Sequence, residues 1–209
     1  MIHLAIDIGA SSGRHIAAWR EDGELKMKEI YRFPNLPQEQ DGRLVWDLDR
    51  LCREVVSGLR ACGEQGITPD SVGIDTWAVD YVLLDGADKP IPPLYCYRDS
   101  RGAEGAEIAH KVIPFDRLYA KTGIQFQPFN TIYQLCWDKA HGRLDNAADF
   151  LMLPEYLSFY LSGVKAHEYT NASSTGLLDA KGRTWDMEIV SALGLPERLF
   201  AARPHTPPV

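Results

Sequence analysis

The 209-residue sequence predicts an α/β domain in which helices flank a mixed β-sheet. Three observations predict this class. Three strand-like segments come first and are joined by short turns, which is the pattern of an antiparallel meander. An amphipathic helix follows them, and another strand-like run follows that helix. The second half of the chain is richer in helical patterns than in strand patterns.

The first three strands are predicted from apolar runs that contain alternating polar positions. A loop of small residues, Gly9 to Gly13, joins the first strand to the second, and the turn signal Glu21-Asp22-Gly23 joins the second to the third. Residues 34–46 contain two prolines and a glycine and are expected to form a loop. The three strand-like segments are 2–8 (IHLAIDI), 14–20 (RHIAAWR) and 24–33 (ELKMKEIYRF).

The first helix is predicted from apolar residues at helical spacing between Leu48 and Leu59. Asp47 and Asp49 lie at its start, where carboxylates favour the positive end of a helix, and Gly63 and Gly66 can end it. Residues 71–86 (SVGIDTWAVDYVLLDG) then read as a strand with an irregularity near Trp77 and Ala78. Three strands, a helix and a strand is the order with which the ribonuclease-H-like unit of actin-like ATPases and sugar kinases begins.

The remaining elements follow from helical periodicity and from breaker residues. Residues 150–156 (FLMLPEY) are expected to form a short strand that meets a helix, and residues 167–178 a loop. The domain is expected to span residues 1–202, and the proline-rich residues 203–209 to begin a linker. The expected helices are 101–111, 115–120, 130–140, 154–162 and 184–195, the last capped by Thr184 or Asp186.

Composition and charge exclude several classes of function. The net charge of −7 argues against a nucleic-acid surface, which needs clustered lysine and arginine, but it leaves a small anionic ligand possible. No segment is apolar enough to span a membrane, and the N-terminus has no secretory signal. The sequence therefore predicts a cytoplasmic protein with reduced, mostly buried thiols at Cys52, Cys62, Cys96 and Cys136.

The loop after the first strand has the composition of an anion-binding turn. Backbone N–H groups in a tight turn can hold a phosphate, hydroxyls add donors, and glycines permit close approach. Asp7 at the strand end would repel a bare phosphate but suits Mg²⁺, directly or through water. The alternative is a plain hairpin turn whose polar side chains satisfy backbone groups. The candidate phosphate-binding residues are Asp7, Gly9, Ala10, Ser11, Ser12, Gly13 and Arg14.

Three further segments combine polar side chains with aromatic faces, which suits a polyhydroxylated ligand. Asp75 and Asp80 lie in an apolar run beside Trp77, although an edge strand with solvated carboxylates would give the same pattern. The alternatives for the other two segments are an ion-pair cluster that caps a helix and ordinary aromatic core. These segments contain Arg98, Asp99 and Arg101, and Gln125, Phe126, Phe129, Asn130, Tyr133 and Gln134.

These segments together resemble the N-terminal region of the rhamnulokinases, a branch of the FGGY carbohydrate kinase family. The first motif is widely shared among sugar kinases and actin-like ATPases, whereas GIDTWAVDYVLLD and QFQPFNT are narrower. The likeness runs in order from residue 2 to about residue 200. The segments are AIDIGASSGR, WDLDRL, SVGIDTWAVDYVLLD, YRDSR, TGIQFQPFNTIYQL and EYTNASSTGLLD.

The resemblance implies phosphorylation of L-rhamnulose at its 1-hydroxyl with ATP and Mg²⁺. It matches Asp7 to the Mg²⁺-associated aspartate, residues 10–14 to the ATP-phosphate loop, and Trp77–Ala78 to a sugar-contacting stretch, where relatives often have glycine in place of Ala78. The resemblance further suggests sugar contacts from Asp80, Arg98, Asp99, Gln125, Phe126 and Asn130.

The resemblance also implies a C-terminal domain, to which residues 203–209 would lead, and it implies that part of the catalytic apparatus is absent from these residues. The family's general base is an aspartate in an S-H-D-T-A-like segment, and no H-D-T occurs in this chain, so the base is expected beyond residue 209. No catalytic residue is therefore assigned here, and the 209 residues alone are expected to be inactive. The alternatives are another FGGY sugar kinase, such as an L-fuculokinase, and a non-catalytic module that binds sugar or phosphate.

Overall fold

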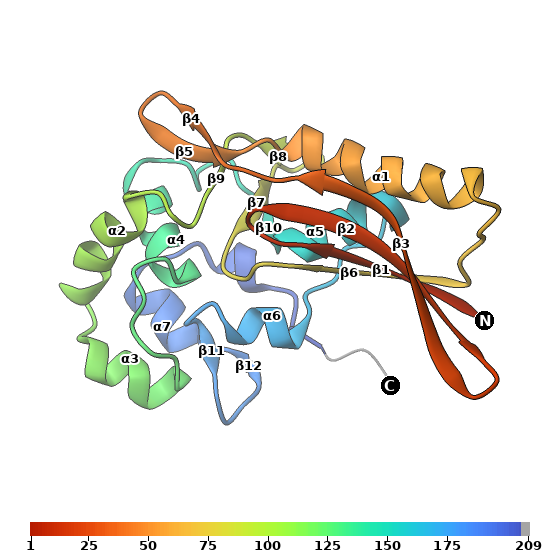
Figure 1. The fold of residues 1–209 in the computed structure, drawn as a ribbon. Coiled ribbons are helices and arrows are strands. Elements are labelled where there is room, and N and C mark those ends of the chain that lie inside the picture. The colour runs from red at the N-terminus through yellow and green to blue at the C-terminus, as the bar shows by residue number, and fades with distance from the viewer. Residues whose placement is uncertain (206–209) are drawn as a thin grey trace.

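A four-stranded mixed sheet organises the first third of the molecule (Figure 1). The computed structural model describes residues 1–205, so residues 206–209 of the expected linker lie outside the described part. Strands β1, β2 and β3 form the expected antiparallel meander, and β6 runs parallel to β1. The sheet order is β3-β2-β1-β6, with β1 at Ile2–Ile8, β2 at Ser12–Glu21, β3 at Glu24–Pro34 and β6 at Ser71–Thr76.

The predicted first helix, α1 (Leu48–Glu64), lies along one face of this sheet (Figure 1). Its N-cap is Asp47, whose side chain accepts a hydrogen bond from the Arg50 N–H. Alternation along β1 explains why one face is covered: Leu4, Ile6 and Ile8 are buried in the core that α1 shares. The intervening side chains, Asp7 among them, point to the other face.

The loop expected at residues 34–46 is wrong in part, because it contains a hairpin. Strands β4 (Gln38–Gln40) and β5 (Arg43–Trp46) are joined by Asp41 and Gly42, which both have positive φ. These two residues supply the tight turn, and the prolines lie before the hairpin rather than inside its strands. The β5 strand also pairs with β9 (Leu94–Tyr95), a contact between segments about fifty residues apart.

The strand predicted over residues 71–86 is two strands in different sheets. After β6 the chain bends at the expected irregularity near Trp77 and Ala78, and β7 (Tyr81–Leu84) enters a second sheet. That sheet has the order β10-β7-β8, with β10 at Asp149–Met152 and β8 at Pro90–Ile91. The bend places residues 77–80 between the two sheets, where their side chains can meet several segments.

The expected helices in the second half are confirmed at four places and shortened at a fifth. They are α2 (Arg101–His110), α3 (Phe115–Thr122), α4 (Thr131–Ala140), α5 (Leu153–Ser162) and α7 (Met187–Ala192). Asp186 caps α7, whereas Thr184 and Trp185 form strand β12, which pairs with β11 (Leu178–Asp179). In the region expected to be a loop, Glu168 caps the short helix α6 (Tyr169–Ser173).

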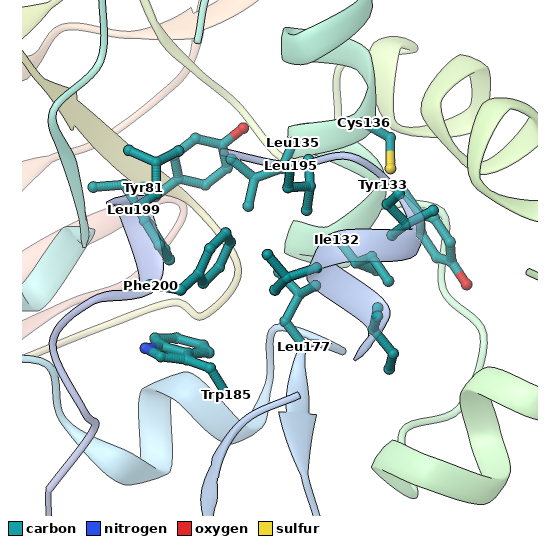
Figure 2. Close-up of a cluster of buried hydrophobic side chains, with 14 of the residues drawn as sticks. Tyr81, Ile132, Tyr133, Leu135, Cys136, Leu177, Trp185, Leu195, Leu199 and Phe200 are labelled. Carbon is teal, nitrogen blue, oxygen red and sulfur yellow. The ribbon is translucent and has the colours of Figure 1, made fainter. Parts of the chain in front are cut away.

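A second core, distinct from the one beneath the sheet, joins the helical half (Figure 2). Tyr81 from β7 meets residues of α4, of the segment before β11 and of the 3₁₀-helix η1 (Glu197–Phe200). The α2 and α4 helices approach closely because Gly105 has no side chain, since a Cβ there would lie 1.9 Å from the Tyr133 carbonyl oxygen. Within residues 1–205, no helix is both long enough and apolar enough to cross a membrane.

Candidate functional site

The loop between β1 and β2 is held by hydrogen bonds to three of its carbonyl oxygens. Gly9 donates its N–H to the Ser12 carbonyl at 2.9 Å, and Asn35 donates its backbone N–H to the Ser11 carbonyl at 2.9 Å. The side-chain amide of Asn35 donates to the Gly9 carbonyl at 2.8 Å. Among the described residues, the N–H groups of Ala10 and Ser11 donate to no acceptor. The loop therefore offers two amides to an external acceptor while three of its carbonyl groups are engaged.

Gly13 is required by packing beneath this loop. A Cβ at this position would lie 2.1 Å from the ring of Phe33, which is buried on β3. The ring and the loop can therefore be in contact only if residue 13 has no side chain. This close packing explains why residue 13, one of the two glycines in the phosphate-loop candidate, has no side chain.

Asp7 and Arg14 form an ion pair on the two strands, β1 and β2, that flank the loop. They are directly opposite each other on β1 and β2, and the Arg14 Nη2 lies 2.7 Å from the Asp7 Oδ2. Both side chains are a little under half exposed, so each can exchange its partner for a ligand. The part of the chain that the structure describes contains no group of three or more metal-ligating side chains. Asp7 and Asp75, which are register partners on β1 and β6, place two accessible carboxylates near the free amides, and this combination fits Mg²⁺ bound mainly through phosphate and water.

A second cluster is built around the carboxylate of Asp80, which is completely buried. Its Oδ2 accepts hydrogen bonds from the indole N–H of Trp77 at 2.7 Å and of Trp46 at 2.8 Å, and from the backbone N–H of Tyr97 at 3.1 Å. Burial raises the pKa of Asp80 to about 6, against the opposing effect of these hydrogen bonds and of the Arg101 charge. Asp80 thus fixes two indole rings, whose centroids are 4.3 Å apart, and exposes no atom of its own.

The turn that carries Trp77 and Ala78 has an unusual backbone. Val79 adopts φ of 72°, a left-handed conformation that a β-branched residue rarely takes. The Thr131 hydroxyl at 2.9 Å and the Gln134 side-chain amide at 3.1 Å both donate to its carbonyl oxygen. These two contacts from α4 hold the conformation, so that Ala78 is exposed and Trp77 is only half-buried.

The structure separates the charged residues of the YRDSR segment. Asp99 is buried and accepts hydrogen bonds from the backbone N–H groups of Leu44 and Arg101, each at 2.9 Å, and it also faces Arg43 at 3.3 Å. This arrangement joins β5 to the start of α2. Asp99 forms its ion pair with Arg43 rather than with Arg98 or Arg101, so the three residues do not form the ion-pair cluster given as the alternative. Arg98 by contrast is exposed, and its Nε donates to the Tyr97 hydroxyl at 3.0 Å.

Arg101 belongs to a buried polar network behind the Asp80 cluster. Its guanidinium lies 3.1 Å from the carboxylate of Asp138 and donates to the side-chain oxygen of Gln134. The NH₂ group of the same Gln134 side chain donates to the Val79 carbonyl oxygen. Arg101 is therefore placed to support the turn at Val79 rather than to meet a ligand.

The third predicted segment contributes a different aromatic residue from the one expected. Phe129 lies 5.7 Å from Tyr97 between ring centroids, whereas Phe126 packs with His110, Phe115 and Tyr133. Asn130 donates its side-chain amide to the Gln125 carbonyl at 3.0 Å, which closes this loop. The structure therefore brings the segment, through Phe129, next to the Trp77–Asp80 cluster.

Sequence reasoning missed three residues of these two clusters: Asn35, Trp46 and Tyr97. Each lies in a segment that reads as loop or short strand, and no local pattern marks its contacts. A cavity of about 570 Å³ near the start of α1 shares only Trp46 with the Asp80 cluster. It is formed mainly by β5, α1 and residues 89–94, and it includes no residue of the phosphate-loop candidate.

Comparison with known proteins agrees with the resemblance seen in the sequence. The FGGY family of carbohydrate kinases, N-terminal domain, matches residues 2–206, and the chain therefore belongs to this family. Curated relatives are more specific. A rhamnulokinase of Halalkalibacterium halodurans is 48% identical over 199 residues, and one of Bacillus subtilis is 40% identical over 201 residues. These alignments include 94% and 96% of this chain but only 42% and 41% of the relatives.

Solved structures show the same fold at low sequence identity. A xylulose kinase from Rhodospirillum rubrum superimposes with a TM-score of 0.84 at 17% identity, over 98% of this chain and 43% of that one. A ligand-bound xylulose kinase from Lactobacillus acidophilus gives a TM-score of 0.79 at 20% identity, over 94% of this chain and 40% of that one. The predicted fold, an actin-like α/β domain with an antiparallel first meander, is confirmed.

Proposed function

We propose that this chain is the N-terminal part of an ATP-dependent kinase that phosphorylates L-rhamnulose at its 1-hydroxyl. The observation that carries the proposal is the 48% identity to a rhamnulokinase over 199 residues, together with a family match over residues 2–206 that includes both the loop after β1 and the Trp77–Asp80 segment. The chain covers about two fifths of the length of such relatives. We propose a second domain for the remainder, with residues 203–209 beginning the linker, and a cytoplasmic location.

In this proposal the loop between β1 and β2 binds the phosphates of ATP. The free amides of Ala10 and Ser11 and the hydroxyls of Ser11 and Ser12 donate to phosphate oxygens. Arg14 would pair with a phosphate oxygen in place of Asp7, and Asp7 would help to hold Mg²⁺, directly or through water. The cation, when bound, neutralises the charge that develops on the transferred phosphoryl group.

The sugar in this proposal lies against Trp77, Ala78, Tyr97 and Phe129. Half-buried aromatic faces suit a sugar's apolar C–H surfaces, and exposed backbone at Ala78 can approach it closely. Asp80 holds the Trp77 and Trp46 rings in place from behind. Arg98 and Gln125, both exposed, are proposed to reach hydroxyl groups when the two domains close.

The decisive experiment is a substrate panel on the protein expressed with its full downstream coding sequence. ADP release would be measured with L-rhamnulose, L-fuculose, D-xylulose and glycerol. We expect the highest kcat/KM with L-rhamnulose; a higher value with L-fuculose would instead identify the L-fuculokinase alternative. No turnover with any ketose would support a non-catalytic module.

The 209-residue chain would be assayed alongside the longer protein. Because no H-D-T segment is present to supply a general base, we expect its rate to be lower by at least about a hundredfold. A rate equal to that of the longer protein would show that the base lies within these 209 residues.

A further inference from the structure

The phosphate-loop candidate depends on one residue outside it, Asn35, which directly follows β3. Asn35 is only 5% exposed, although asparagine is usually a surface residue. Its backbone N–H and its side-chain NH₂ group both donate to the loop, at the Ser11 and Gly9 carbonyl oxygens respectively. No local sequence pattern indicates this contact, since 26 residues separate Asn35 from Gly9.

These two contacts fix the direction of specific amides. In a trans peptide unit the C=O of one residue and the N–H of the next are coplanar and point in opposite directions. When Asn35 holds the Gly9 carbonyl, the Ala10 N–H must therefore point away from Asn35. In the same way, holding the Ser11 carbonyl turns the Ser12 N–H away from Asn35.

The hydrogen bond from the Asn35 side chain to the Gly9 carbonyl replaces a backbone hydrogen bond that a simple hairpin would make. In a tight hairpin turn, the carbonyl of the first turn residue normally accepts a hydrogen bond from the N–H of the fourth. Here Gly9 donates to Ser12, but the Gly9 carbonyl accepts from the Asn35 side chain instead. A turn that needed only to connect two strands would not require a buried amide from a third strand's end.

We propose that Asn35 is a positioning residue, whose side chain aims the Ala10 amide at the polyphosphate of the bound nucleotide. The proposal rests on the proposed function, because it assumes that this loop binds phosphate. Asn35 itself touches the loop from behind and makes no contact with the ligand. Its role is to keep the carbonyl oxygens, which would repel an anion, turned toward the protein.

The chain offers a matched control for removing the Asn35 amide. Gln65, at the end of α1, also donates its side-chain amide to a backbone carbonyl, that of Ile30 on β3, at 3.1 Å. Asn35→Ala and Gln65→Ala therefore remove the same kind of hydrogen bond between a side chain and β-sheet backbone. Only the first of these hydrogen bonds involves the loop.

The test is titration of the ¹⁵N-labelled 209-residue chain with inorganic tripolyphosphate and Mg²⁺, followed by the amide signals of Ala10 and Ser11. In the unsubstituted chain we expect both signals to shift. In Asn35→Ala we expect the dissociation constant to rise at least about tenfold, the worth of one hydrogen bond to a charged group. Gln65→Ala is expected to bind as the unsubstituted chain does.

Two outcomes would overturn the proposals and can be told apart. If the unsubstituted chain leaves both amide signals unshifted, the phosphate-loop assignment is wrong and the inference about Asn35 falls with it. If the unsubstituted chain and Asn35→Ala bind tripolyphosphate equally well, only the inference about Asn35 is wrong. Should Asn35→Ala fail to fold, Asn35→Asp keeps the side-chain size, and Gln65→Glu becomes its charge-matched control under the same two criteria.

Discussion

At the scale of single residues, the carboxylate of Asp80 determines how the side chains of the Trp77–Asp80 cluster are arranged. Three hydrogen bonds converge on one of its oxygens and come from β5, from the turn after β6 and from the segment after β9. A buried carboxylate with three donors is satisfied, but losing the acceptor would leave the indole N–H groups of the buried Trp46 and the half-buried Trp77 without this partner. Asp80 therefore stabilises the geometry of Trp46 and Trp77 together.

Replacing Asp80 by asparagine tests this role. Because the amide cannot accept from three donors as a carboxylate does, we expect Asp80→Asn to lower the free energy of unfolding by about 1–3 kcal/mol. The environment of both tryptophans should also change. Urea unfolding followed by tryptophan fluorescence measures both effects. Asp75→Asn, an exposed aspartate five residues away, is the control and should cost less than about 0.5 kcal/mol.

At the scale of elements, a buried histidine joins β10 to α5 and to the segment before α6. His167 is 4% exposed and lies 3.5 Å from the Asp149 carboxylate on β10 and 3.7 Å from the Glu155 carboxylate on α5. Lys165 also faces Asp149, at 3.0 Å. Burial by itself would lower the pKa of His167, but the two carboxylates raise it to about 9.

This cluster predicts that stability falls with rising pH in the alkaline range. The pKa of His167 in the folded protein is above its value of 6.5 in the unfolded chain, so folding is favoured when the histidine is protonated. The stabilisation is complete below about pH 6.5 and is lost as the pH rises through about 9. At about 1.4 kcal/mol per pKa unit, the loss is at most ~3 kcal/mol.

Urea unfolding at intervals from pH 6 to pH 9.5 would measure this loss. His167→Gln should be less stable at pH 6 and show a flatter pH dependence over the same range. His3→Gln replaces an exposed histidine on β1 and should keep the slope of the unsubstituted chain. Equal slopes in the unsubstituted chain and in His167→Gln would contradict the assignment.

At the scale of the whole molecule, the two edges of the four-stranded sheet differ. The β3 edge has alternating charged side chains, which discourage pairing with another strand. On the opposite edge, no strand among residues 1–205 pairs with the outer side of β6, and Val72 there is 42% exposed. The charged side chains of β3 are Glu24, Lys26, Lys28, Glu29 and Arg32.

The open β6 edge predicts that the 209-residue chain associates at high concentration. Light scattering should show a mass above that of the 23.4 kDa monomer. Val72→Lys, which adds a charge to the edge, should shift the equilibrium toward monomer. Met27→Lys, at a 67% exposed position on β3, is the control and should leave association unchanged. A monomer for the unsubstituted chain throughout the concentration range would contradict the prediction.

Much of the fold could be predicted, and so could the segments that contain the two candidate clusters, because these features depend on residues that are adjacent in the sequence. Alternation predicts β1 to β3, a 3.6-residue period predicts α1, and small residues between two strands predict the loop at residues 9–13. The hairpin of β4 and β5 was missed because prolines nearby outweighed a short apolar run. The division of residues 71–86 between two sheets was missed because each half reads equally well as strand.

The amino-acid sequence is enough to predict the class of domain, the family, and the segments that carry polar and aromatic groups. The contacts that those groups make are visible only in the folded chain. Asn35 meets a loop 26 residues away, and Trp46 meets Asp80 at a separation of 34 residues. Local periodicity contains no information about which distant segments become neighbours, because that depends on sheet order and packing. The physical division is therefore between backbone preferences set by adjacent residues and side-chain partners set by the folded chain.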